Sequence, residues 1–235
     1  MTGLSNNDDP AHDLPLGEPV PGPATDAFGA FCTRKRVWLG FGLLEREEAF
    51  LFDSAIVIGP DGLIHLKYRC NNPCWHDRNA DPLVYRQGTE IAKAETPIGS
   101  AAFLVCGDLF DDNVVDRFQA LKPDVLLFPI ACGYETCKDV SMAQRLWDEQ
   151  EMPKYITHIG KAGALTLMVN SVGHPTLAHD NGFGGARGQR YEETAAIFEA
   201  QYLDKVEFQT PAGRALAAEK KAYTKDFLNR LREEW

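Results

Sequence analysis

Apolar, strand-like runs alternate with helix-like segments in the second half of this chain of 235 residues. The apolar run at 101–105 is followed by a helical pattern over Asp111–Leu121. The run Val125–Pro129 is followed by another helical pattern over about 140–161, and the run Leu165–Asn170 closes the series. Strands that are joined through helices usually pair in parallel, with the helices covering the sheet. The alternation therefore predicts an α/β protein with a parallel or mixed sheet.

The first half of the chain has a different pattern. Residues 1–23 hold five prolines and show no periodicity, so we expect an extended or disordered lead-in. A short helix should begin at Thr25, where a polar residue precedes spaced apolar side chains. Three apolar or alternating runs follow, Val37–Leu44, Phe50–Ile58 and Leu63–Tyr68. They predict three successive strands, of which at least two form a hairpin.

Composition narrows the class of protein. The chain is long enough for one substantial core and needs no second domain. A formal net charge of −10 argues against nucleic acid or an anionic membrane as partner, since phosphates are bound by clustered Lys and Arg. No apolar stretch has the length of a membrane span, and the first residues lack the parts of a signal peptide. We therefore expect a cytoplasmic protein whose six cysteines are reduced and that acts on a small molecule or binds a protein partner.

Cys106 is the strongest candidate for a chemical role. It directly follows the apolar run at 101–105 and precedes Gly107 and Asp108. A thiol there lies at the carboxyl end of a buried strand, where α/β proteins place reactive groups, and a following helix favours negative charge. An inert buried cysteine is the alternative reading, because such cysteines are common. For Asp108, capping of the helix Asp111–Leu121 is favoured over contact with a substrate.

An ordered series of short motifs runs along the chain. The motifs are Pro19-Val20-Pro21-Gly22-Pro23-Ala24-Thr25, Gly42-Leu43-Leu44-Glu45-Arg46, Asp53-Ser54-Ala55, Gly59-Pro60-Asp61-Gly62, Lys67-Tyr68-Arg69, Cys106-Gly107-Asp108-Leu109, Asn170-Ser171-Val172-Gly173 and Phe183-Gly184-Gly185. In order and spacing this series resembles the carbon-nitrogen hydrolase (nitrilase) superfamily. The resemblance implies an α-β-β-α sandwich that cleaves non-peptide amides or nitriles, here incomplete at its amino terminus. We expect one domain, with the lead-in over 1–23, the hydrolase-like part over 24–186 and a divergent helical segment over 187–235.

The resemblance implies a Glu-Lys-Cys mechanism with Cys106 as the nucleophile and the Gly107 amide as part of the oxyanion site. The strand that carries the family's glutamate has no counterpart in the sequence, and Glu45 matches a different position beside the pocket. Cys70 occupies the position of the family's lysine. Lys67 lies three residues earlier, and this odd offset places it on the opposite face of a strand unless the strand ends or bulges in between.

A further group of residues has two possible readings, a zinc site or a polar loop. Cys70, Cys74, His76 and Asp77 have donor atoms for zinc, but no second pair of ligands is visible in the sequence. A polar loop at the edge of the pocket is the favoured reading. We therefore expect neither a metal nor a cofactor.

Two functional hypotheses follow. The first is hydrolysis of a small amide or nitrile through a thioester on Cys106. The second is a catalytically impaired homologue that acts through binding or oligomerisation, with helices such as the one around Trp147 forming the contact between subunits. A homodimer or other homo-oligomer is expected in either case. A redox or metal sensor that uses Cys70 and Cys74 is a more distant third reading.

Overall fold

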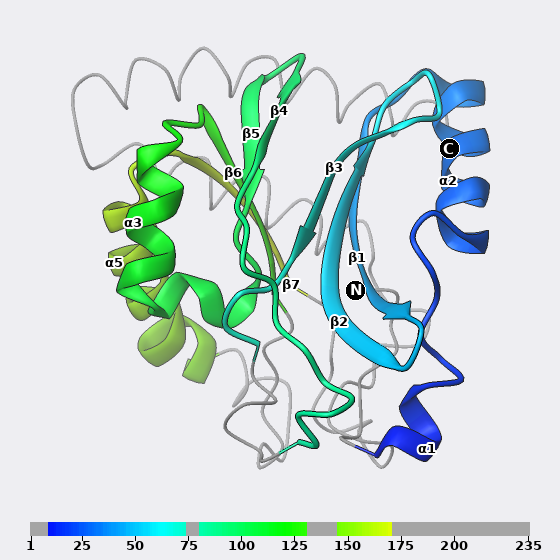
Figure 1. The fold of residues 1–235 in the computed structure, drawn as a ribbon. Coiled ribbons are helices and arrows are strands. Elements are labelled where there is room, and N and C mark those ends of the chain that lie inside the picture. Colours follow the sequence, from blue (N-terminus) through cyan, green and yellow to red (C-terminus); the bar gives the residue numbers. More distant parts are fainter. Residues whose placement is uncertain (1–8, 74–79, 131–144, 171–235) are drawn as a thin grey trace.

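The computed structural model describes residues 9–73, 80–130 and 145–170. Its elements are α1 (Pro10–Asp13), α2 (Pro23–Lys35), β1 (Leu39–Glu47), β2 (Phe50–Ile58), β3 (Ile64–Arg69), β4 (Lys93–Thr96), β5 (Gly99–Phe103), the 3₁₀ helix η2 (Cys106–Phe110), α3 (Asp112–Ala120), β6 (Val125–Ile130), the π-helical turn η3 (Trp147–Glu151), α5 (Met152–Ala162) and β7 (Leu165–Asn170). Two sheets pack face to face, with α2 outside one sheet and α3 and α5 outside the other (Figure 1).

The first sheet has the antiparallel order β1-β2-β3. Because side chains alternate along a strand, each of its two faces has its own partners. Leu43 and Ile56 point outward and pack with Cys32 of α2. Ala55 and Val57 point inward, toward the second sheet. Both faces of β2 are therefore buried, which explains why its sequence is a nearly continuous apolar run.

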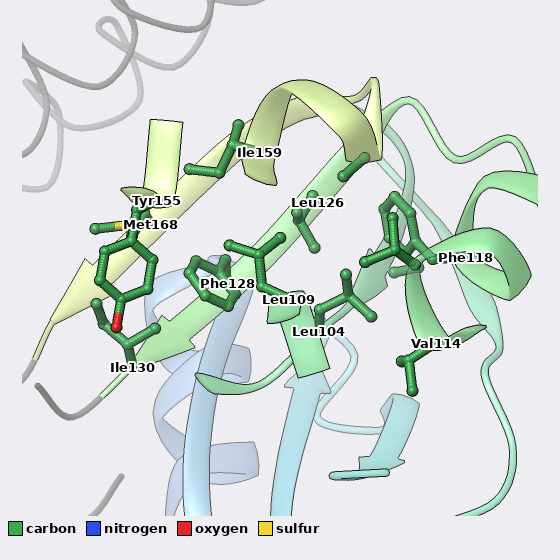
Figure 2. Close-up of a cluster of buried hydrophobic side chains, with 13 residues drawn as sticks. Leu104, Leu109, Val114, Phe118, Leu126, Phe128, Ile130, Tyr155, Ile159 and Met168 are labelled. Atoms are coloured by element: carbon green, nitrogen blue, oxygen red, sulfur yellow. The ribbon is translucent and has the colours of Figure 1, made fainter. Parts of the chain in front are cut away.

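The second sheet has the order β4-β5-β6-β7, in which β4 is antiparallel to β5 and the other strands are parallel. Helices α3 and α5 lie in the two crossovers between the parallel strands. They cover the outer face of this sheet and close the largest apolar cluster (Figure 2). The cluster consists of Ala102, Leu104, Leu109, Val114, Val115, Phe118, Leu126, Phe128, Ile130, Tyr155, Ile159, Ala162 and Met168.

A second apolar cluster joins the two sheets. The rings of Tyr68 on β3 and Phe103 on β5 are stacked, with centroids 6.4 Å apart. Cys70 and Val105 extend this cluster beyond the ends of the same strands, and Cys106 packs against it. The packing of the sheets therefore brings the end of β3 beside the end of β5.

The structure confirms the predicted mixed sheet with covering helices. One expectation was wrong, because residues 10–13 of the supposedly extended lead-in form α1. The Asp9 side chain caps this helical turn by accepting from the Ala11 amide, and Pro10 supplies its first residue. Asp13 is fully buried and accepts a hydrogen bond of 2.6 Å from the Tyr85 hydroxyl. A partner this distant in sequence leaves no local signal.

Some expected elements fall outside the described residues. These include the whole segment 187–235 and the beginning of the helix expected over about 140–161. The described part of that helix contains η3 and then α5, with Pro153 in the first turn of α5, where a proline is tolerated. None of the described helices has the length and apolar character needed to cross a membrane.

Candidate active site

Cys106 is the first residue of η2, just beyond the end of β5. The backbone before it is extended, and Cys106 itself has a φ of 44°. A positive φ costs a non-glycine residue about 1–3 kcal/mol, and such residues cluster at functional sites. The side chain is half-buried and reduced. The chain thus turns sharply at a half-buried cysteine.

Asp108 fastens this turn to the end of β3. Its buried carboxylate accepts from the amides of Asn71 at 2.9 Å and Asn72 at 2.7 Å. It also accepts from the Tyr68 hydroxyl at 2.7 Å and the Val105 amide at 2.8 Å. Four donors from two distant segments therefore converge on one carboxylate, and together they fix the position of η2.

This arrangement corrects the expected role of Asp108. The side chain that caps α3 is Asp111, which accepts from the amides of Asn113 and Val114. Burial raises the pKa of Asp108, although hydrogen bonds from Val105, Tyr68 and other donors act in the opposite direction. Asp108 therefore joins two segments of the chain.

Cys70 directly follows β3 and points toward the second sheet, into the apolar cluster against which Cys106 packs. Its buried thiol donates to the carbonyl oxygen of Val105 at 3.4 Å, and its amide donates to the Asp53 carbonyl at 2.7 Å. Burial raises the pKa of Cys70 well above its usual value, and the nearby Asp108 and Asp53 carboxylates raise it further. Where the family resemblance implies a lysine, the structure thus has a neutral thiol.

Glu45 and Lys67 lie together on the other face of the first sheet. The Glu45 carboxylate is 1% exposed and accepts from Lys67 Nζ at 2.8 Å and from Ser54 Oγ at 2.6 Å. Arg69 donates to it twice, from Nη2 at 2.6 Å and from Nε at 3.0 Å. Burial alone would raise the pKa of Glu45, but the hydrogen bonds from Arg69, Lys67 and Ser54 lower it to about 2.

Strand alternation explains why Glu45 and Lys67 lie on the face of the first sheet that points away from Cys106. Lys67 and Arg69 point outward, whereas Tyr68 and Cys70 point toward the second sheet. The irregularity in the pairing of β2 with β3 falls between Val57 and Ile58, opposite the start of β3. No bulge therefore turns Lys67 inward, and the structure does not bring Lys67 and Glu45 to the side of Cys106.

Gly107 is held closely against the loop after β3. Its carbonyl accepts a hydrogen bond of 3.0 Å from the Asn72 side chain. A β-carbon at Gly107 would collide with the carbonyl oxygen of Asn72. Glycine is thus required here by the close approach of two backbone segments.

Asp53 is a residue of this region that the sequence reasoning did not single out. It lies two residues before Ala55 on β2, so its side chain is on the same inward face, and it is half-buried. Burial raises its pKa to about 7, and the Asp108 carboxylate contributes to the shift. An acidic residue inside an otherwise apolar strand was the signal available in the sequence.

The zinc reading receives no support from the described residues. Among them, no group of three or more His, Cys, Asp or Glu side chains could hold a metal ion. Cys70 lies within the described part of the chain, but Cys74, His76 and Asp77 lie outside it.

Comparison with known proteins places this geometry in context. The family model "Carbon-nitrogen hydrolase" matches residues 2–187. A formamidase of Bacillus cereus (strain Q1) is 43% identical over 56 residues, which are 23% of this chain and 17% of that protein. A formamidase of Bacillus thuringiensis (strain Al Hakam) is 41% identical over 56 residues, with the same shares. The chain thus spans only a small part of the curated relatives that it matches.

Solved structures share the fold. A carbon-nitrogen hydrolase from Helicobacter pylori G27 aligns with a TM-score of 0.58 and 20% identity, covering 74% of this chain and 59% of that one. A CN-hydrolase superfamily protein from Xanthomonas campestris aligns with a TM-score of 0.55 and 19% identity, covering 73% and 60%. These likenesses confirm the predicted sandwich of helices and sheets. Because the family model covers most of the sequence, the chain belongs to the carbon-nitrogen hydrolase family.

Proposed function

We propose that the protein hydrolyses a small non-peptide amide through a thioester on Cys106. The observation that carries the proposal is the position of this half-buried thiol, at a positive φ just beyond the end of β5 and directly before the Gly107 amide. Strained, partly exposed cysteines at strand ends are the kind of group that acts as a nucleophile. The formamidases among the relatives make a short amide the natural first substrate to test.

The proposed reaction has two steps. The Cys106 sulfur bonds to the carbonyl carbon as the thiol gives up its proton, and the Gly107 amide donates to the developing oxyanion. The carbon–nitrogen bond then breaks as the leaving nitrogen takes that proton. Water then attacks the thioester carbon, the carbon–sulfur bond breaks to release the carboxylic acid, and one proton of the water returns to the Cys106 sulfur.

Ammonia release from formamide, acetamide and butyramide tests the proposal on the full chain. We expect Cys106→Ala to abolish the release. Cys32→Ala is the matched control, because Cys32 lies under α2 on the far side of the first sheet and should not affect the reaction. A Cys106→Ala protein that keeps the wild-type rate would refute the nucleophilic role.

A second candidate function is binding or oligomerisation without turnover. It is favoured by the neutral Cys70 at the lysine position and by the engagement of Lys67 with Glu45 on the far face. Removing members of a cooperating catalytic set costs several orders of magnitude in rate. Absence of ammonia release together with a stable dimer in light scattering would support this alternative. The homodimer and the cytoplasmic location remain predictions from the sequence.

A further inference from the structure

Two cysteines from distant parts of the chain are held side by side near the end of β5. The Cys70 thiol donates to the Val105 carbonyl, which belongs to the residue directly before Cys106. The neighbouring residues reinforce the contact, because Asn72 donates from its side chain to the Gly107 carbonyl at 3.0 Å. Both sulfur-bearing residues also pack in the apolar cluster between the sheets.

The separation of the two residues follows from peptide geometry. The carbonyl oxygen of a trans peptide lies about 3 Å from the next α-carbon. With 3.4 Å between the Cys70 sulfur and the Val105 oxygen, that sulfur lies within roughly 6 Å of the Cys106 α-carbon. Rotation of the Cys106 side chain toward Cys70, with a small shift of the backbone, would bring the two sulfurs to the separation of about 2 Å that a disulfide requires.

The two thiols differ in exposure and in reactivity. Cys106 is half-buried and lies where the chain turns away from the strand, so it is more accessible to a small oxidant than Cys70. Cys70 is 1% exposed and faces the Asp53 and Asp108 carboxylates, which disfavour its thiolate. Oxidation therefore begins at Cys106, because oxidants attack accessible sulfur first. Cys70 is then the nearest described thiol able to complete the reaction.

We propose that Cys106 and Cys70 form a dithiol site that hydroperoxides oxidise to an intrachain disulfide. The Cys106 thiolate attacks the distal peroxide oxygen, the O–O bond breaks, and an alcohol or water leaves after taking a proton. The Cys70 sulfur then attacks the sulfenic acid of Cys106, the S–O bond breaks, and water leaves with the thiol proton. The dithiol loses two electrons and the peroxide gains them.

The disulfide would block any chemistry at Cys106 until a dithiol reductant restores it. The pairing does not depend on amide hydrolysis, because it requires only the two thiols and a peroxide. A protein without amidase activity could therefore still show it, and the two proposals can fail separately.

Peptide mapping under non-reducing conditions tests this pairing on the native full chain. The protein is treated with hydrogen peroxide, remaining thiols are blocked with N-ethylmaleimide, and the tryptic peptides are analysed by mass spectrometry. Trypsin leaves Cys70 and Cys74 on one peptide, so the mapping is repeated with Cys74→Ser as the matched control. We expect a cross-link between this peptide and the one containing Cys106 in both proteins, and its disappearance after reduction.

Cys70→Ser supplies the second measurement. We expect no cross-link in this variant, and a Cys106 sulfenic acid that dimedone traps in larger amount than in the wild type. Unchanged circular dichroism of the variant would show that it folds. The proposal is overturned if peroxide leaves both wild-type thiols open to N-ethylmaleimide, or if the cross-link disappears in Cys74→Ser and persists in Cys70→Ser.

Discussion

Replacement of Glu45 by glutamine tests whether the outward cluster of Glu45, Lys67 and Arg69 stabilises the first sheet. The carboxylate has two cationic partners and is 1% exposed. Lowering its pKa from the ordinary 4.5 to about 2 corresponds to about 3 kcal/mol, at 1.36 kcal/mol for each pH unit. Removing one member of a buried ion pair costs about 3–5 kcal/mol in other proteins, which agrees with this magnitude.

The pH dependence gives the same prediction a second check. Because the folded-state pKa is depressed, the stabilisation is fully present above pH 4.5 and is lost as the pH falls toward 2. Urea unfolding of wild type and Glu45→Gln should therefore differ by about 3 kcal/mol at pH 7, and the difference should shrink steadily below pH 4.5.

Glu47→Gln is the matched control for this experiment. Glu47 also pairs with Arg69, at 3.0 Å, but its side chain is 57% exposed. Solvent screens such pairs, so only a small change in the free energy of unfolding is expected. A Glu45→Gln variant as stable at pH 7 as Glu47→Gln would refute the reasoning, because it would show that burial adds nothing to the ion pairs.

Three further predictions concern the region between and behind the sheets. Asp53→Asn should raise the melting temperature at pH 8 but not at pH 3. The pKa of Asp53 is about 7 in the folded state and 3.8 as its ordinary value, so its ionisation lowers the stability of the fold as the pH rises from 3.8 toward 7. Equal shifts of the melting temperature at both pH values would contradict this. Gly107→Ala should destabilise the protein and slow any ammonia release, because the new methyl group would collide with the Asn72 carbonyl oxygen. A variant with wild-type stability and a wild-type rate of ammonia release would count against this close approach. Phe118→Ala should lower the free energy of unfolding in urea by about 3–5 kcal/mol, since the ring is 1% exposed in the outer core; a loss below about 1 kcal/mol would mean that the cluster refills the cavity.

The strands and the location of Cys106 were predictable because their signals are local. An apolar run such as Val125–Pro129 specifies a buried strand, and a thiol directly after such a run lies at the strand end. Alternation also predicted that Lys67 would face away from the position of Cys70. Only a bulge would have changed this, and β3 is regular at that point.

The partners of the charged residues were not predictable. Arg46 directly follows Glu45 in the sequence, but the side-chain partners of Glu45 come from β2 and β3. Asp108 accepts from amides 36 and 37 residues away, and this depends on how the two sheets are packed. Such contacts arise only after the backbone is folded, so no spacing along the chain encodes them.

The two sheets also differ in when they can form during synthesis. β1, β2 and β3 are consecutive in sequence, whereas β6 and β7 pair across the whole of α5. Contacts between neighbours in sequence form faster than contacts that first close a long loop. We therefore expect the first sheet to emerge from the ribosome with its inward face uncovered until Phe103 arrives on β5. During this interval the nascent chain exposes Tyr68 and Cys70, which makes it a target for chaperones.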